Sequence, residues 1–173
     1  MEQPNSGSGR PDGADGTDEF ALIERLADAF AAAGPPAVPG DLGIGDDAAL
    51  IALPPGPAVL ATDLVVGGVH VDPDVSSPAD IGWKSLMVAV SDLAAMGAEA
   101  RAALLSVAAP AGFPVERLAD GVAEAATMTG CAVVGGDLSA SPVLVVSVAV
   151  VGWVPEDGAG PALRRDGACP GDT

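Results

Sequence analysis

The chain has 173 residues, of which 49% are hydrophobic, and its formal net charge at neutral pH is −17. This length and apolar content predict one globular domain with at most part of a second. The 24 acidic residues outnumber the 7 basic ones. That balance excludes the basic footprint that nucleic acid or an anionic membrane requires, and it is compatible with binding of divalent cations.

The N-terminus has neither the basic segment nor the apolar segment of a signal peptide, and no uninterrupted apolar run is long enough to cross a bilayer. Cys131 and Cys169 lack the spacing of a metal site, and we interpret them as free thiols rather than as a disulfide. We therefore expect a cytoplasmic protein with no membrane or nucleic-acid partner.

The first predicted helix covers residues 18–33. Residues 1–17, rich in Gly, Ser, Pro and Asp, are expected to form a disordered tail. Within residues 18–33 apolar side chains recur at three- and four-residue spacing, which predicts a helix that packs through one face. Thr17 is the expected N-cap, and Gly34 followed by two prolines ends the helix.

Two adjacent carboxylates follow two glycines in the stretch Gly43-Ile44-Gly45-Asp46-Asp47. Glycine lets the backbone bend tightly and approach a ligand, and neighbouring carboxylates repel each other unless a cation or donor lies between them. The stretch is either a metal–phosphate loop or an ordinary solvated turn. We expect a strand over residues 48–53 to pair as a hairpin with a strand over residues 58–62, which ends at Asp63.

The helix predicted over residues 78–96 has the clearest boundaries. Ser77 is the expected N-cap, Asp80 lies three residues later as in a capping box, and Gly97 ends the helix. Its second half is apolar on nearly all sides, which predicts burial. The carboxylate of Asp92 would then need a partner, either a cation, a metal or a helix N-terminus, or else hydrogen bonds from backbone N–H groups.

The second half of the chain alternates strands and helices. A strand over residues 131–134 ends in Gly135-Gly136-Asp137, which repeats the earlier pattern of an apolar strand followed by glycine and a carboxylate. Residues 155–173 are expected to form a linker and the start of a C-terminal domain that is absent from this sequence. The other predicted elements are a strand over 101–108, a helix over 114–130 and a strand over 142–153. Together the elements predict an α/β (α+β) domain over residues 18–154, with a mixed sheet packed by two main helices.

The recurring aspartates point to a magnesium site that handles phosphate. Clustered carboxylates select a hard cation such as Mg²⁺, which commonly bridges substrate phosphates. The chain has no P-loop and its basic residues are scattered, so metal ions would carry most of the charge neutralisation in a phosphoryl transfer. A paired-carboxylate hydrolase is the competing interpretation, but it does not explain the adjacent glycines. The positions concerned are Asp46, Asp47, Asp63, Asp92 and Asp137.

Six stretches, taken in order, carry a resemblance to a known family. They are Gly43 to Ala49, Thr62-Asp63, Gly68 to His70, Asp80 to Leu86, Ser91 to Ala98, and Gly135-Gly136-Asp137. In this order and at this spacing they resemble the thiamine-monophosphate kinases, which belong to the aminoimidazole-ribonucleotide-synthetase-like ATP-binding superfamily. The resemblance covers roughly residues 19–172.

The resemblance implies ATP-dependent phosphorylation of thiamine monophosphate to thiamine diphosphate, by direct transfer with several Mg²⁺ ions. No catalytic residue is implied beyond the metal ligands. By itself the lone His70 is more typical of a surface or capping residue, whereas the resemblance implies that it contacts the thiamine substrate. The implied Mg²⁺ ligands are Asp47, Thr62, Asp63, Asp92 and Asp137, with Asp46 as a weaker candidate, and the implied ATP contacts are Gly136, Asp137 and Arg165.

The family has two α/β domains, and the resemblance implies that the N-terminal domains of two chains join their sheets into a barrel-like homodimer. This chain corresponds to the N-terminal half, so the isolated chain could be inactive. Ala89 and Leu138 depart from the family pattern, which often has Asn and Thr there. The alternatives are a superfamily relative of the hydrogenase-maturation or selenophosphate-synthesis type, or a non-catalytic dimerisation module.

Overall fold

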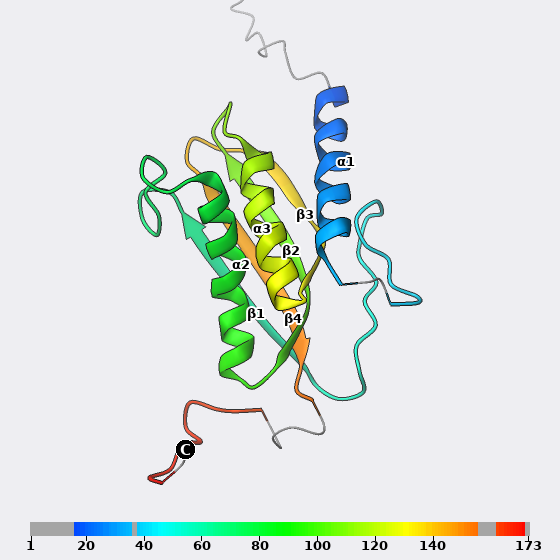
Figure 1. Cartoon of the computed structure of the whole chain (residues 1–173), viewed down its shortest axis with the longest axis vertical. Coiled ribbons are helices and arrows are strands. Elements are labelled where there is room, and N and C mark those ends of the chain that lie inside the picture. Colours follow the sequence, from blue (N-terminus) through cyan, green and yellow to red (C-terminus); the bar gives the residue numbers. More distant parts are fainter. Residues whose placement is uncertain (1–15, 36–37, 156–161, 172–173) are drawn as a thin grey trace, which may run out of the picture.

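The structure, a computed structural model, describes residues 16–35, 38–155 and 162–171 (Figure 1). Residues 1–15 of the predicted N-terminal tail and residues 156–161 and 172–173 of the predicted linker lie outside these residues. The elements in chain order are α1 (Gly16–Ala33), β1 (Ala58–Val66), α2 (Pro78–Ala95), β2 (Glu99–Ala109), α3 (Val115–Thr129), β3 (Ala132–Ala140) and β4 (Val145–Trp153).

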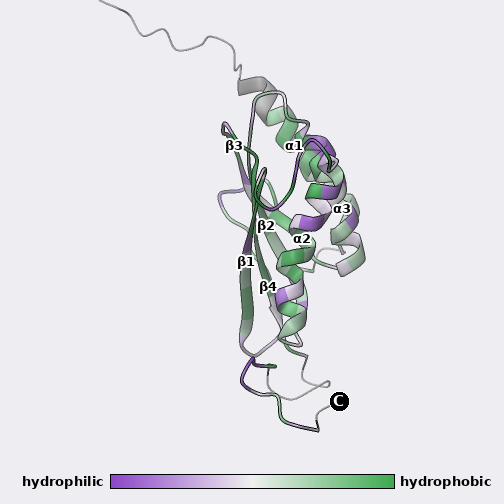
Figure 2. Cartoon of the chain, turned by 90° about the vertical axis from the view of Figure 1, so that its left-hand side faces the viewer, coloured by the Kyte–Doolittle hydropathy of each residue, from purple (hydrophilic) through white to green (hydrophobic). Residues whose placement is uncertain are grey.

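The four strands form one mixed sheet in the order β1-β4-β2-β3. β4 pairs antiparallel with both β1 and β2, while β2 and β3 are parallel neighbours joined by α3. The helices lie on one side of the sheet, and Figure 2 shows the sheet edge-on as a single layer with this side covered. The predicted α/β class with a mixed sheet is confirmed.

The core lies between the sheet and the helices. Along β4, Val146, Val148 and Val150 are buried, and they alternate with residues that face away from the helices. This period of two is the signature of a strand with one covered face. α2 and α3 pack on each other, and α2 also packs on β1 and β4. Among the described helices, none combines the length and the apolar character needed to cross a bilayer.

No described helix covers the opposite side of the sheet, here named the open face (Figure 2). Three of its leucines remain exposed, with relative accessibilities of 74% for Leu60, 53% for Leu64 and 47% for Leu104. Leu60 and Leu64 lie on β1, and Leu104 lies on β2, which is two strands away in the sheet. A sheet face with several large exposed side chains of this kind is typical of an interaction surface.

The predicted boundaries of α2 and α3 are confirmed. The Ser77 side chain accepts a hydrogen bond from the Asp80 N–H, and the Asp80 side chain accepts one from the Ser77 N–H, which completes the capping box. Gly97 and Gly130 follow the two helices with φ of +70° and +68°, a conformation that glycine adopts without a steric penalty. The helix α1 begins at Gly16, so Thr17 lies inside it and the predicted N-cap is wrong.

The predicted strand over residues 48–53 and its hairpin are wrong. Leu50 pairs with Leu42 through two backbone hydrogen bonds of 2.8 Å, and this isolated bridge closes a loop. Leu50 and Leu53 are 61% and 37% exposed, so the run buries too little apolar surface to be held as a strand. The partner of β1 is β4, which lies far along the sequence.

Two strands extend beyond their predicted ends. β1 continues through Asp63 to Val66 because β4 offers it a ladder over its whole length. β3 continues from Val134 through Gly135-Gly136-Asp137 because β2 pairs with it in parallel, with a register shift beside Leu104. Both aspartates therefore lie within strands, and the prediction that they follow strand ends is wrong.

Candidate functional site

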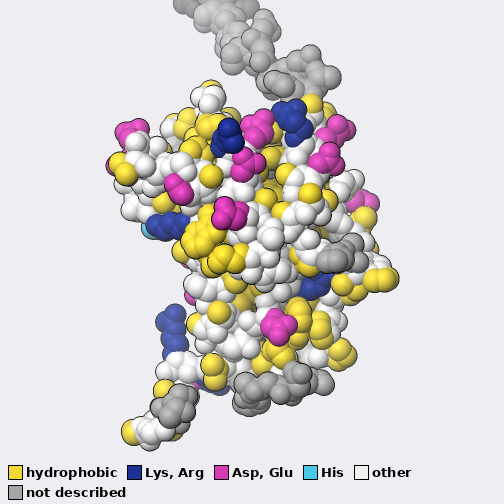
Figure 3. Space-filling model, viewed as in Figure 1, with side chains coloured by type: hydrophobic (Ala, Val, Ile, Leu, Met, Phe, Trp, Pro, Cys, Tyr) yellow, Lys and Arg dark blue, Asp and Glu magenta, His cyan; other side chains and the backbone are white. Residues whose placement is uncertain are grey.

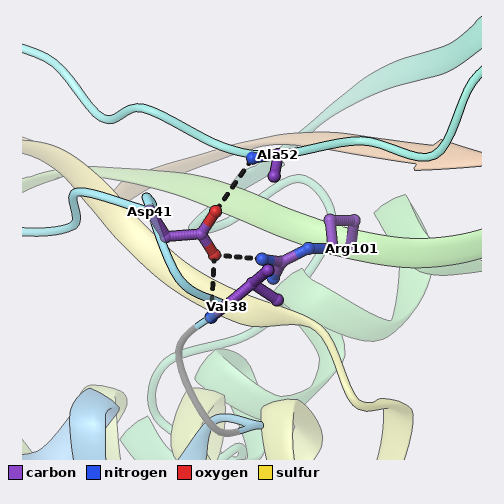
Figure 4. Close-up of polar contacts among 4 residues, drawn as sticks. All are labelled: Val38, Asp41, Ala52 and Arg101. Carbon is purple, nitrogen blue, oxygen red and sulfur yellow. Dashed lines mark hydrogen bonds and ion pairs between the residues drawn. The ribbon is translucent and has the colours of Figure 1, made fainter.

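Residues 42–51, here named the aspartate loop, carry Asp46 and Asp47. The loop is fastened at its base by Asp41, whose carboxylate accepts hydrogen bonds from the Ala52 N–H at 2.8 Å and from the Val38 N–H at 3.3 Å. The same carboxylate forms an ion pair with the Arg101 guanidinium of β2 (Figure 4). Both side chains of the pair are only 9% exposed.

The environment of Asp41 stabilises its charged form. The hydrogen bond from the Ala52 N–H, together with Arg101, lowers the pKa of the Asp41 carboxyl below its ordinary value, against the opposing effect of desolvation. Neither Asp41 nor Arg101 is among the site residues predicted from the sequence. Along β2, every second residue from Arg101 to Leu105 is buried. A charged residue in this otherwise apolar series was the signal in the sequence that could have pointed to a buried ion pair.

The backbone of the aspartate loop depends on one of its two glycines. Gly45 has a φ of +127°, a conformation that residues with a β-carbon rarely adopt. Immediately after it, the Asp46 carboxylate accepts a hydrogen bond from the Asp47 N–H at 2.8 Å. Both aspartates are exposed, so their carboxylates are accessible to a cation.

The loop meets strand β3 at a small pocket. This cavity of about 150 Å³ brings Ile44 of the aspartate loop beside Gly136 and Asp137. The cavity walls are otherwise mainly apolar side chains. The structure thus joins two of the sequence motifs, which are more than 85 residues apart, on the β3 side of the sheet. The remaining lining residues are Ile23, Leu26, Phe30, Leu105, Gly135 and Leu138.

Thr62 and Asp63 lie on β1, at the other edge of the sheet. Neighbouring residues of a strand point to opposite faces, and Thr62 is exposed on the open face while Asp63 is half-buried on the helix side. Asp63 is paired with Val148 of β4, whereas Asp137 is paired with Ser106 of β2. Since β4 and β2 lie between their strands, the two aspartates are separated across the sheet by about 14 Å of strand spacing.

His70 lies in the turn that follows β1. Its Nδ1 accepts a hydrogen bond from the Val66 N–H at 3.0 Å, and Lys84 of α2 donates from Nζ to the His70 carbonyl oxygen at 2.8 Å. A ring nitrogen that accepts a hydrogen bond is unprotonated, so the neutral ring carries its proton on Nε2. The exposed side chain therefore presents one N–H donor outward.

The expectation that Asp92 is buried is wrong. Asp92 is exposed on α2, as is the neighbouring Ser91, because the helix buries only one stripe and its outer side carries small residues. The chain segment with Arg165 passes the same end of α2: the Leu163 N–H donates to the Met96 carbonyl at 2.9 Å. Figure 1 shows this C-terminal segment below α2.

The predicted metal ligands do not converge in the single chain. Within the described ranges, no group of three or more His, Cys, Asp or Glu side chains is placed to hold a metal ion. Acidic side chains are spread over the helical face seen in Figure 3. The candidate residues instead form separate sets on the β3 edge, on β1, and at the end of α2.

Most of the chain matches a known protein family. Residues 45–154, more than half of the chain, match the model of the AIR synthase related protein, N-terminal domain. The chain belongs to this family. The match begins at Gly45 of the aspartate loop and ends just after β4, so it covers the whole sheet and both helices of the core.

Several proteins similar to this AIR synthase related domain are named thiamine-monophosphate kinase. A thiamine-monophosphate kinase of Mycobacterium tuberculosis is 40% identical over 149 residues, which are 84% of this chain and 43% of the relative. The crystal structure of the enzyme from Stenotrophomonas maltophilia aligns with a TM-score of 0.69 at 39% identity, over 86% of this chain and 45% of that one. A structure described as "AaThiL complexed with AMPPCP and TMP" aligns with a TM-score of 0.53 at 28% identity, over 89% and 48%.

These relatives confirm the predicted resemblance to the thiamine-monophosphate kinases. The chain spans a little less than half the length of the relatives it matches.

Proposed function

We propose that the protein acts in the ATP-dependent phosphorylation of thiamine monophosphate to thiamine diphosphate. The observation that carries this proposal is the 40% identity to a thiamine-monophosphate kinase across 84% of the chain. The relative bound to AMPPCP and TMP supports an ATP-type nucleotide and thiamine monophosphate as the substrates. Among the described residues no disulfide joins Cys131 to Cys169, which suits work in the reducing cytoplasm.

The proposed Mg²⁺ ligands are the carboxylates of Asp47, Asp63, Asp92 and Asp137, with Thr62 beside them and Asp46 as a weaker candidate. Their hard oxygen donors fit Mg²⁺, and those of Asp46, Asp47, Asp92 and Asp137 are solvent-accessible. Bound there, Mg²⁺ would offset the charge of the nucleotide phosphates, in a chain whose net charge of −17 would otherwise repel them. Gly136, Asp137 and Arg165 are the proposed ATP contacts.

The substrate phosphate needs no general base, because it is already ionised at neutral pH. The protein's contribution is then to position the two phosphate groups and to neutralise their charge. His70 is proposed to contact thiamine monophosphate. Its Nδ1 is occupied by the Val66 N–H, so the group available to the substrate is the Nε2–H donor.

We further propose that the protein is a homodimer joined through the open face. Leu60, Leu64 and Leu104 give this face the apolar area that an interface between copies requires. Dimerisation would also account for the separation of the predicted ligands. The set on the β3 edge of one copy and the set on β1 and α2 of the other would together complete each site.

The decisive experiment measures binding of AMPPCP to the chain by calorimetry as Mg²⁺ is varied. Binding should require Mg²⁺, and Asp92→Asn and Asp137→Asn should each weaken it by about 10-fold or more, as loss of a metal-bound carboxylate does. Glu124→Gln, an exposed acid on α3, serves as the control. Dimerisation without nucleotide affinity would overturn the kinase proposal and leave a dimerisation module.

A second experiment tests the shared site. An Asp63→Asn protein and an Asp137→Asn protein, each weakened in nucleotide binding, are mixed under conditions that exchange subunits. If sites are shared between copies, each heterodimer contains one intact site. In an equal mixture about half of all dimers are heterodimers, so about half of all dimers regain one site. No recovery after verified subunit exchange would show that each site is built within one copy.

A further inference from the structure

We infer that Asp41 and Arg101 form a positioning pair, which sets the direction in which the aspartate loop presents Asp46 and Asp47. This inference rests on the proposed function only for the ligand, a magnesium-bound nucleotide. Neither residue of the pair is among the proposed metal or nucleotide contacts. Their role is therefore to act through the loop and not on the substrate.

The pair fastens both ends of the loop to the sheet at a single point. The Asp41 carboxylate accepts from the Val38 N–H, which precedes the loop, and from the Ala52 N–H, which follows it. The Arg101 guanidinium, which belongs to the central strand β2, holds that carboxylate from the sheet side (Figure 4). One carboxylate thus links three segments of the chain.

Burial alone does not hold the loop. Asp46, Asp47 and Ala48 are exposed, and Leu50 is 61% exposed. Inside the loop, the backbone link between its arms is the Leu42–Leu50 bridge, with two hydrogen bonds of 2.8 Å. A segment with few buried apolar contacts opens easily, so its orientation depends on the polar contacts at its base.

The choice of an ion pair rather than an apolar contact favours positioning over stability. Arg101 is 8% exposed, and a buried ion pair contributes little net stability compared with apolar side chains of similar volume. Its planar guanidinium, however, approaches a carboxylate in defined directions. The pair therefore fixes where the carboxylate lies, and through the Val38 and Ala52 N–H groups where the loop begins and ends.

Amide hydrogen exchange on the whole chain tests the inference without relying on nucleotide binding. In Arg101→Met, which keeps the apolar stem but removes the charge, the amides of Leu42, Leu50 and Ala52 should lose at least about 10-fold of their protection. Amides in the middle of β2 and β4 should keep theirs. Arg101→Lys should restore part of the protection, because an ammonium pairs with a carboxylate without the guanidinium geometry. Arg25→Met removes an exposed ion pair on α1 and is the matched control.

The second readout is affinity for Mg²⁺ with AMPPCP, which Arg101→Met should weaken by about 10- to 100-fold, as loss of a group that orients metal ligands does. The double variant Asp41→Asn/Arg101→Met leaves neither charge of the pair buried without its partner. Its loop amides should exchange as fast as those of Arg101→Met. Unchanged exchange in the loop overturns the inference, as does a loss of protection that is equal throughout β2 and β4. If the wild-type chain binds no nucleotide, the proposed function fails while the exchange experiment still decides the inference.

Discussion

Gly82 of α2 and Gly121 of α3 each lie directly against the backbone of the other helix. A β-carbon on Gly82 would lie 2.0 Å from the carbonyl oxygen of Leu118, and one on Gly121 would lie 1.8 Å from that of Ala79. These two contacts let the helices approach closely over the sheet. The spacing of α2, and so the place of Asp92, depends on both glycines.

Gly82→Ala and Gly121→Ala should each destabilise the chain, because the added methyl group would force the two helix backbones apart. The expected loss in the free energy of unfolding is about 2–3 kcal/mol. Urea unfolding followed by circular dichroism measures it. Gly43→Ala is the control, since a β-carbon there meets no atom of the described residues within 4 Å. Equal stabilities for Gly82→Ala and Gly43→Ala would contradict the close packing.

Adjacent glycines of β3 should respond differently to substitution. A β-carbon on Gly136 would lie 1.7 Å from the Leu105 carbonyl oxygen, whereas one on Gly135 would meet only the end of the Leu104 side chain at 3.0 Å. Gly136→Ala should therefore weaken the β2–β3 pairing, lower the thermal midpoint and expose the β3 amides to exchange. Gly135→Ala should be tolerated far better, because a leucine end can turn aside. A larger loss of stability in Gly135→Ala than in Gly136→Ala would contradict the close β2–β3 contact at Gly136.

The stability contributed by Asp41 should depend on pH. Its pKa is below the ordinary value of 3.8 in the folded chain, first because of the Ala52 N–H and then because of Arg101. A carboxyl with a lowered folded-state pKa contributes its full stability above the unfolded value and loses it as the pH falls through the folded one. The difference in unfolding free energy between wild type and Asp41→Asn should be constant above about pH 5 and shrink below about pH 4. Urea titrations at several pH values measure this difference, with Glu124→Gln for comparison. A difference in unfolding free energy that grows as the pH falls would contradict the prediction.

The two cysteines should differ in reactivity. Cys131 is fully buried, and burial raises the pKa of its thiol to about 12, while Cys169 is exposed. Because the thiolate is the reactive form, iodoacetamide should modify Cys169 in the folded chain and Cys131 only after unfolding. Mass spectrometry of native and urea-treated samples checks this, with Cys169→Ser as the control. Rapid native labelling of Cys169→Ser would show that Cys131 is accessible.

A charge on the open face should prevent the proposed dimer. Leu64→Lys places an ammonium among the exposed leucines of β1 and should shift the chain to monomer without loss of secondary structure, because Leu64 is 53% exposed and packs little within one copy. Light scattering on a sizing column measures the mass. Val75→Lys, at an exposed site in the loop before α2, is the control. A dimer that persists in Leu64→Lys would place the interface elsewhere.

The helices could be predicted because their signals are local. Ser77 and Asp80 begin α2, and Gly97 and Gly130 end the two core helices, through contacts within a few residues. Strand limits could not, because they depend on a distant partner. Asp63 and Gly135 both look like strand ends in the sequence, yet β4 and β2 carry the ladders past them.

The candidate motifs can be recognised in the sequence, but their arrangement in space cannot be predicted from it. The motifs that carry Asp47 and Asp137 are recognisable by spacing, whereas their approach at the Ile44 pocket depends on how the chain crosses the sheet. Asp92 was expected to be buried because its helix is apolar, but the side of the helix that carries Ser91, Asp92 and small neighbouring residues is exposed. The Asp41–Arg101 pair joins positions 60 residues apart, which no local pattern reveals.

The position of β4 has a consequence for the order of assembly during synthesis. Of the four described strands of the sheet, β4 is the last to be synthesised, and it lies between β1 and β2. Among these strands β1 therefore has no neighbour to pair with until β4 has left the ribosome. The segment from β2 to β3 can pair earlier, since its contacts are nearer in sequence. A nascent chain arrested before Val145 would leave β1 unpaired, open to proteases and to pairing with the wrong chain.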